Sequence, residues 1–151
     1  MDAVFDYYIP QLHPLAVHFP ISLVLVACVA ALGWAVQGKA YWFRATWLLM
    51  TTGFIGALFA YFTGDAMYEQ SEGTPMVDLL VDHHEQVALF AVIANGVSWA
   101  VCSLIGLSRR AKLDEQPASI RWGLGVIVLI TAILITWTSH VGGTMVWGVP
   151  R

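Results

Sequence analysis

Four long apolar stretches follow one another along the chain, separated by short polar breaks. They cover residues 14–36, 45–63, 84–107 and 122–139. As helices they would be about 27 to 36 Å long, enough to cross a hydrocarbon core of about 30 Å. None shows the alternation of a barrel strand. The pattern predicts one domain, an all-α membrane protein built as a four-transmembrane-helix bundle.

Composition and charge agree with this fold and suggest an orientation. The chain is 58% hydrophobic and 11% charged, far more apolar than a soluble domain of 151 residues. Six of its seven basic residues fall in the connections after the first and third stretches: Lys39, Arg44, Arg109, Arg110, Lys112 and Arg121. The positive-inside rule makes that side cytoplasmic, so both termini face outward. Topology explains these basic residues, and we expect no nucleic-acid partner.

Turn and cap signals extend two of the predicted helices beyond the membrane. Thr74 followed by Pro75 is a favourable N-cap and first-turn pair, so the third helix is predicted to begin at Pro75. The second helix is predicted to continue to Glu69, which leaves a turn over residues 70–73.

The two prolines of "LHPLAVHFPISL" indicate how the first helix begins. Pro14 is suited to the first helical position. Pro20 removes the hydrogen bond to Ala16 and disfavours helical geometry at Phe19. We therefore expect kinked or irregular backbone near His18, of a kind tolerated where it lines a site.

All five histidines of the chain collect at the outer end of the predicted bundle, on three different helices: His13, His18, His83, His84 and His140. His84 shares a helical face with small and polar residues and is predicted to point inward: Ala91, Asn95, Ser98 and Cys102. His140 lies above Thr136 and Ala132 and is also predicted to point inward, as is His18, one turn above Ser22. His83 is expected at the interface and His13 at the membrane boundary.

Inward histidines from several helices indicate a cofactor or metal site. Polar groups inside a membrane are costly and tend to be functional. Two opposed imidazoles among His18, His84 and His140 would hold a haem b iron, whereas three convergent ones would suit Zn or Cu, with Asp65 or Glu69 as an added ligand. The small residues Gly53, Ala57, Ala60 and Gly64 allow either close helix packing or a flat ring beside the second helix. Cys28 and Cys102 are expected to be packing residues.

Four motifs resemble one known family along nearly the whole chain. They are "LHPLAVHFPISL", "TGD" at the end of the second helix, "HHEQVALF" in the third and "GGTMVWG" after the fourth. Together they resemble the family catalogued as domain of unknown function 2231. The resemblance implies a small four-helix protein of the bacterial inner membrane without an assigned activity. Some members are joined to, or placed beside, c-type cytochrome or Rieske domains, which suggests redox partners.

The resemblance extends most directly to His13, His18 and His84. The family pattern usually has an acidic residue after the two glycines and a histidine near the end. Here Thr144 follows Gly143, and the tail lacks that histidine. His140, just before the glycines, is the candidate substitute.

Three hypotheses about function follow. The first is a haem b electron-transfer subunit near the periplasmic face that exchanges electrons with a periplasmic c-type cytochrome, a quinone or a larger redox complex. The second is a non-catalytic anchor subunit of a membrane complex. The third is a His-based Zn or Cu site for sensing or transport. A stand-alone enzyme is disfavoured, because no nucleophile–base pair or paired carboxylates appear.

Overall fold

The computed structural model describes residues 12–68, 75–108 and 112–147. Within these ranges the chain forms four long helices, α1 (Leu12–Gln37), α2 (Ala40–Tyr68), α3 (Pro75–Leu107) and α4 (Ala118–Trp147), and a short 3-10 helix, η2 (Leu113–Glu115). The described ranges contain no strand. The predicted all-α fold is confirmed.

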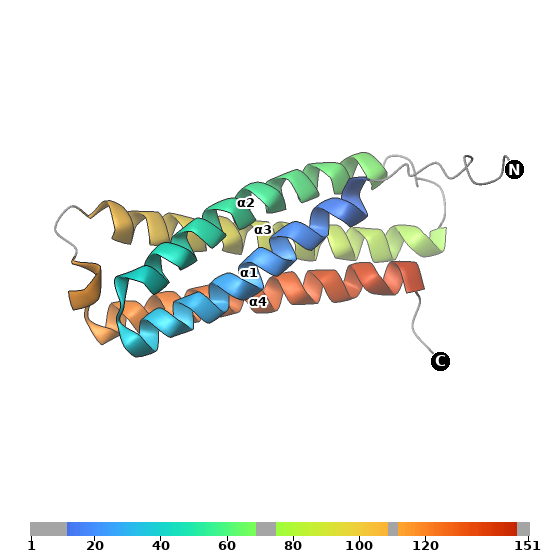
Figure 1. Ribbon diagram of the computed structural model, residues 1–151. Coiled ribbons are helices and arrows are strands. Elements are labelled where there is room, and N and C mark those ends of the chain that lie inside the picture. Colours follow the sequence, from blue (N-terminus) through green and yellow to red (C-terminus); the bar gives the residue numbers. More distant parts are fainter. Residues whose placement is uncertain (1–11, 69–74, 109–111, 148–151) are drawn as a thin grey trace, which may run out of the picture.

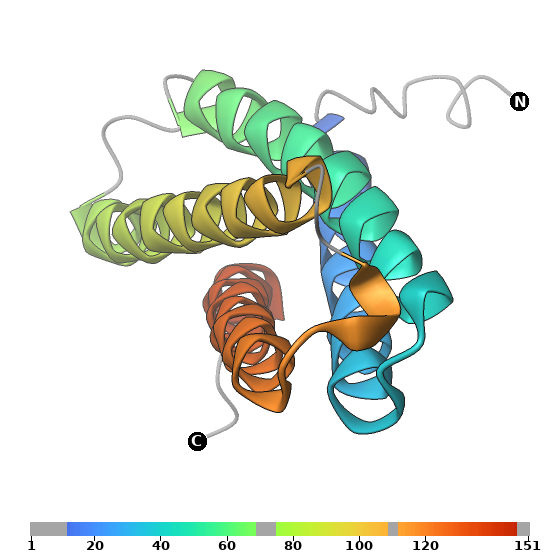
Figure 2. The same cartoon turned by 90° about the vertical axis from the view of Figure 1, so that its left-hand side faces the viewer.

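The helices run alternately up and down, and each packs against the next one along the chain (Figure 1). α4 also packs against α1, so the four helices form a closed bundle, as the end-on view in Figure 2 shows. The starts of α1 and α3 lie with the ends of α2 and α4. We call this end the histidine end, and the opposite end, with Lys39, Lys112 and Arg121, the basic end.

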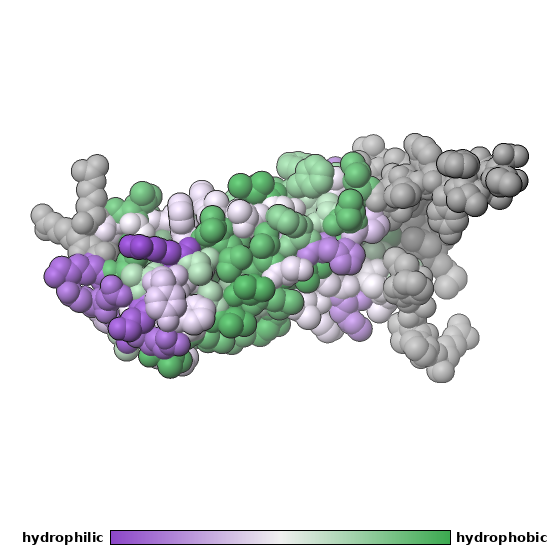
Figure 3. Space-filling view, in the orientation of Figure 1, coloured by the Kyte–Doolittle hydropathy of each residue, from purple (hydrophilic) through white to green (hydrophobic). Residues whose placement is uncertain are grey.

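Each long helix has the length and composition of a membrane span. The segments that qualify are Leu12–Gln37, Ala40–Asp65, Leu79–Leu107 and Ala118–Met145. Large apolar side chains point outward along the bundle, among them Val29, Phe90 and Ile133. Figure 3 shows an apolar belt between the ends and a concentration of hydrophilic residues at the basic end. The membrane prediction is thus confirmed by length, composition and surface.

The predicted helix extensions are largely correct. α3 begins at Pro75, and α2 continues to Tyr68. Glu69 and the predicted turn at 70–73 lie outside the described residues. α1 begins at Leu12, so Pro14 is its third residue rather than its first. Proline is suited to this position too, because the first four N–H groups of a helix have no partner within it and the missing N–H of proline costs no hydrogen bond.

The irregular backbone expected near His18 is not found. α1 is a continuous helix from Leu12 to Gln37 with Pro20 inside it. Pro20 is buried, and its ring lies against Gly56 of α2, where an added Cβ would be 3.4 Å from the proline Cδ. Proline is tolerated in a membrane helix when a neighbouring helix supports that region.

Small residues let α1 and α2 approach closely. An added Cβ on Gly53 would lie 3.3 Å from Val24 Cγ2, tighter than most Cβ contacts, so the absence of a side chain at Gly53 leaves room for Val24 of α1. The buried core continues toward the basic end through Trp34, Met50 and Val128. Cys28 and Cys102 are buried free thiols, which agrees with their predicted packing role.

η2 ties the α3–α4 connection to the α1–α2 turn at the basic end. Gly38 closes α1 with φ of 67° and donates its N–H to the Trp34 carbonyl at 2.8 Å. The Trp34 indole donates to the Leu113 carbonyl at 3.3 Å. Asp114 Oδ1 accepts the backbone N–H of Ala40 at 2.6 Å. Asp114 therefore caps the N-terminus of α2, where a negative charge is also favoured by the helix dipole.

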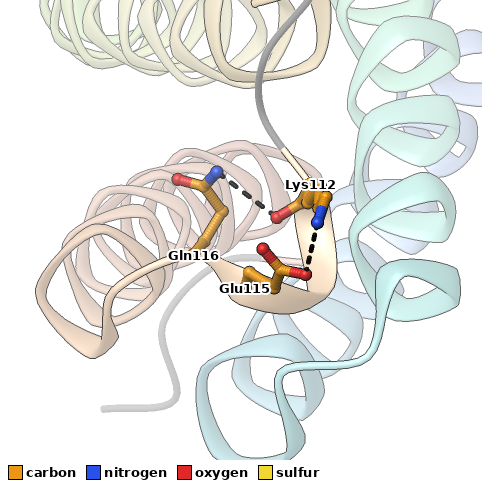
Figure 4. Close-up of polar contacts among 3 residues, drawn as sticks. All are labelled: Lys112, Glu115 and Gln116. Carbon is orange, nitrogen blue, oxygen red and sulfur yellow. Dashed lines mark hydrogen bonds and ion pairs between the residues drawn. The ribbon is translucent and has the colours of Figure 1, made fainter.

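Asp114→Ala is expected to lower the free energy of unfolding by about 1 kcal/mol, because the first turn of α2 loses its cap. Thermal unfolding in detergent measures the change. The matched control is Glu115→Ala in the same turn. Glu115 makes an exposed ion pair with Lys112 at 3.0 Å, beside a Gln116 contact to the Lys112 carbonyl (Figure 4). Such a pair contributes less than about 1 kcal/mol. Equal effects of the two variants would contradict the capping role.

Candidate functional site

Two histidine rings meet between helices at the histidine end. His13, in the first turn of α1, and His84, on α3, have ring centroids 6.4 Å apart and ring planes at 84°. Both side chains are partly buried. We call these two residues the histidine pair.

Hydrogen bonds to α2 fix the orientation of the His13 ring. Its Nδ1 lies 2.9 Å from the Ala60 carbonyl oxygen and 3.3 Å from Thr63 Oγ1. A carbonyl only accepts, so in the neutral ring Nδ1 carries the proton and Nε2 carries a free lone pair. The Thr63 hydroxyl donates to the same Ala60 carbonyl at 2.9 Å. This is the arrangement in which a metal-binding histidine donates its other N–H to a carbonyl.

His84 has an unused ring nitrogen. Its Nδ1 is buried and has no hydrogen-bond partner among the described residues. Buried polar nitrogens are nearly always paired in folded proteins. The orphaned nitrogen therefore indicates that this ring is suited to a ligand.

A glycine receives each ring of the pair. A Cβ on Gly64 would lie 2.9 Å from Cε1 of His13, and a Cβ on Gly142 would lie 3.0 Å from Cε1 of His84. A contact below 3.0 Å is essentially never seen for a real Cβ atom, and one at 3.0 Å is tighter than most. Gly64 on α2 and Gly142 on α4 therefore leave the space in which the two rings lie.

The site joins all four helices and all four sequence motifs. His13 comes from "LHPLAVHFPISL", Gly64 from "TGD", His84 from "HHEQVALF" and Gly142 from "GGTMVWG". The motifs are far apart along the chain, and the up-and-down topology places them at one end of the bundle. Sequence analysis placed Gly64 in a stripe of small residues suited to close helix packing or to a flat ring, and it gave Gly142 no role in a site. Their positions in the motifs "TGD" and "GGTMVWG" were the available signal.

The other three histidines lie outside the pair. His83 is exposed, as expected for an interfacial residue. His18 and His140 are also exposed, so the predicted convergence of His18, His84 and His140 inside the bundle is not found. His18 Nδ1 donates to the Pro14 carbonyl of its own helix. The His140 ring lies 6.0 Å from the ring of Trp137, which is itself exposed.

A larger ligand set is not assembled around the pair. Among the described residues, no group of three or more histidine, cysteine, aspartate or glutamate side chains is placed to hold a metal ion. Asp65 is exposed at the end of α2, and Glu69 lies outside the described residues. The described donor set at this end of the bundle consists of the two imidazoles of the histidine pair.

Gly142→Ala is expected to be less stable than Gly143→Ala. Both changes gain helix propensity of up to about 1 kcal/mol. An added Cβ on Gly143 meets nothing within 4 Å, whereas one on Gly142 presses against His84. We also expect Gly142→Ala alone to shift the imidazole ¹⁵N signal of His84 in histidine-labelled protein. An unchanged signal with equal stability would contradict the contact.

Comparison with known proteins identifies one family. A family model described as "Predicted membrane protein (DUF2231)" matches residues 10–149. No curated protein and no solved structure matches the chain.

Proposed function

The chain belongs to the DUF2231 family of predicted membrane proteins, and from this premise we propose that it is a haem b electron-transfer subunit whose iron is held by His13 and His84. The observation that carries the proposal is the histidine pair: two rings from different helices, 6.4 Å apart and nearly perpendicular. The proposal keeps the haem of the sequence analysis and replaces the ligands His18 and His140 with His13.

The chemistry of the donors supports a haem. In its neutral form His13 has a free Nε2 and a partnered Nδ1, and His84 has an unpartnered buried Nδ1. Each ring is therefore able to offer a lone pair. The glycines at 64 and 142 leave room for the two imidazole rings themselves. The residues present thus fit a group that takes two imidazole ligands.

The position of the rings also supports two imidazole ligands for one group. The two ring centroids lie 6.4 Å apart at the same end of the bundle, so one bound group would be able to take a nitrogen from each ring. A Zn or Cu ion would need further protein ligands, which the described residues do not assemble. This comparison favours haem over the Zn or Cu alternative.

The protein's part in the mechanism is to hold and orient the two ligands. A bound haem supplies one-electron transfer. The Ala60 carbonyl accepts the Nδ1–H of His13, which fixes the ring tautomer and raises the basicity of Nε2. Gly64 and Gly142 set how deeply the rings lie between the helices. The position of the pair at the histidine end places electron exchange near one membrane face.

The proposed location is a bacterial inner membrane with the histidine end toward the periplasm. Lys39, Arg44, Lys112 and Arg121 lie at or near the opposite end of the bundle, which supports a cytoplasmic basic end. A periplasmic c-type cytochrome, a quinone at the interface or another subunit of a redox complex would then reach the site. An anchor subunit without cofactor is the alternative that the following measurement separates.

The spectrum of the purified protein tests the proposal. We expect a haem Soret band, an α-band after reduction and a pyridine haemochrome of the b type. His13→Gly and His84→Gly are expected to lose the bis-imidazole spectrum, and added imidazole is expected to restore it by entering the space left by the ring. His18→Ala and His140→Ala are the matched controls, because both side chains are exposed.

The outcomes separate the three hypotheses. A purified protein without iron but with stoichiometric Zn or Cu would replace the haem with a metal site. A protein with neither, isolated with partner subunits, would support the anchor function. Loss of haem in His18→Ala with retention in His13→Gly would exclude the histidine pair.

Reporter fusions test the orientation. Alkaline phosphatase fused after Arg151 is expected to be active, because that end faces the periplasm. The same enzyme inserted between Arg110 and Lys112 is expected to be inactive, and green fluorescent protein at the two positions gives the reverse pattern. An active phosphatase at the basic end would reverse the topology.

A further inference from the structure

Asn95 has a buried carboxamide in the core of the bundle, away from the histidine pair. The residue is 0% exposed and lies near the middle of the Leu79–Leu107 span. Neither Nδ2 nor Oδ1 has a hydrogen-bond partner among the described residues. Leaving such groups unpaired in an apolar interior is costly, and in a membrane no bulk water is available to satisfy them.

The polar neighbours of Asn95 are engaged with one another. One turn further along α3, Ser98 Oγ lies 2.8 Å from Thr131 Oγ1 on α4. Thr131 Oγ1 also lies 3.1 Å from the carbonyl oxygens of Ala94 and Ile127. Ser98 and Thr131 are both 0% exposed. A cluster of polar groups therefore crosses from α3 to α4 beside the carboxamide.

We propose that Asn95 binds an internal water molecule between the helices, in a hydration site at mid-depth of the membrane. The two orphaned atoms have opposite character, since Nδ2 donates and Oδ1 accepts. A cation would satisfy only the oxygen, and an anion only the nitrogen. Water both donates and accepts, and buried waters typically make about three hydrogen bonds to otherwise unpaired groups.

The other unpartnered buried atoms in the described ranges do not share this environment. Trp42 Nε1 and Arg121 Nε lie toward the basic end of the bundle, and His84 Nδ1 belongs to the histidine pair. Asn95 lies between the two ends, on the inward stripe of α3 that includes Ser98 and Cys102. The hydration site does not depend on the haem proposal.

A single labelled residue makes the test direct. Asn95 is the only asparagine of the chain, so ¹⁵N-asparagine labelling gives one side-chain NH₂ group. In phosphatidylcholine nanodiscs with deuterated lipid, we expect cross-peaks from both NH₂ protons to the water resonance. Cross-peaks to protein aliphatic protons alone would overturn the proposal.

A stability comparison gives a second, independent test. Asn95→Leu replaces the carboxamide with an apolar group of the same branching, and we expect Tm to fall by a few degrees as the bound water is lost. Val128→Leu, at a buried position of α4, controls for crowding by a larger side chain. If the carboxamide had no ligand, Asn95→Leu would relieve an unpaired group. A Tm at or above that of the unchanged protein would therefore overturn the hydration site.

Discussion

Inside a membrane every polar group needs a partner within the protein, and this constraint explains most of the architecture. The backbone satisfies it by forming four long helices. Most hydroxyl side chains satisfy it locally: Ser22, Thr46 and Thr136 each donate to the carbonyl four residues earlier in their own helix. Two kinds of polar side chain differ from this local pattern: those that bond to another helix and those with no hydrogen-bond partner among the described residues. These side chains mark the candidate functional positions of the bundle.

Two such places stand out, and they differ in kind. The histidine pair combines one ring held by a neighbouring helix with one ring that keeps a nitrogen free. Such a combination leaves lone pairs available at an accessible end of the bundle. Asn95 is fully buried at mid-depth, and neither polar atom of its carboxamide has a partner among the described residues. The histidine pair carries the proposed haem, and Asn95 carries the proposed internal water.

The sequence predicted the four helices, the extension of α3 to Pro75 and the inward face of His84, because each depends on local patterns of apolarity, capping and helical period. The predicted inward orientation of His18 and His140 is wrong, because both side chains are exposed. Both were placed by neighbouring hydroxyl residues, Ser22 and Thr136, that were taken to mark the interior. Those hydroxyls are exposed and bonded to their own helices, so they carry no information about which face is buried. The pairing of His13 with His84 required knowledge of how the four helices are arranged around the bundle.

The cap that Asp114 provides for α2 has a consequence for the order of assembly. Ala40 and Asp114 are separated by 74 positions along the chain. During synthesis, the first turn of α2 emerges long before its cap exists, and it gains this partner only after α3 has been made. The N-terminal end of α2 therefore lacks this cap until the later half of the chain has been made. Asp114 lies in the α3–α4 connection, which is the last to be synthesised. This connection therefore stabilises the α1–α2 turn, which is the first.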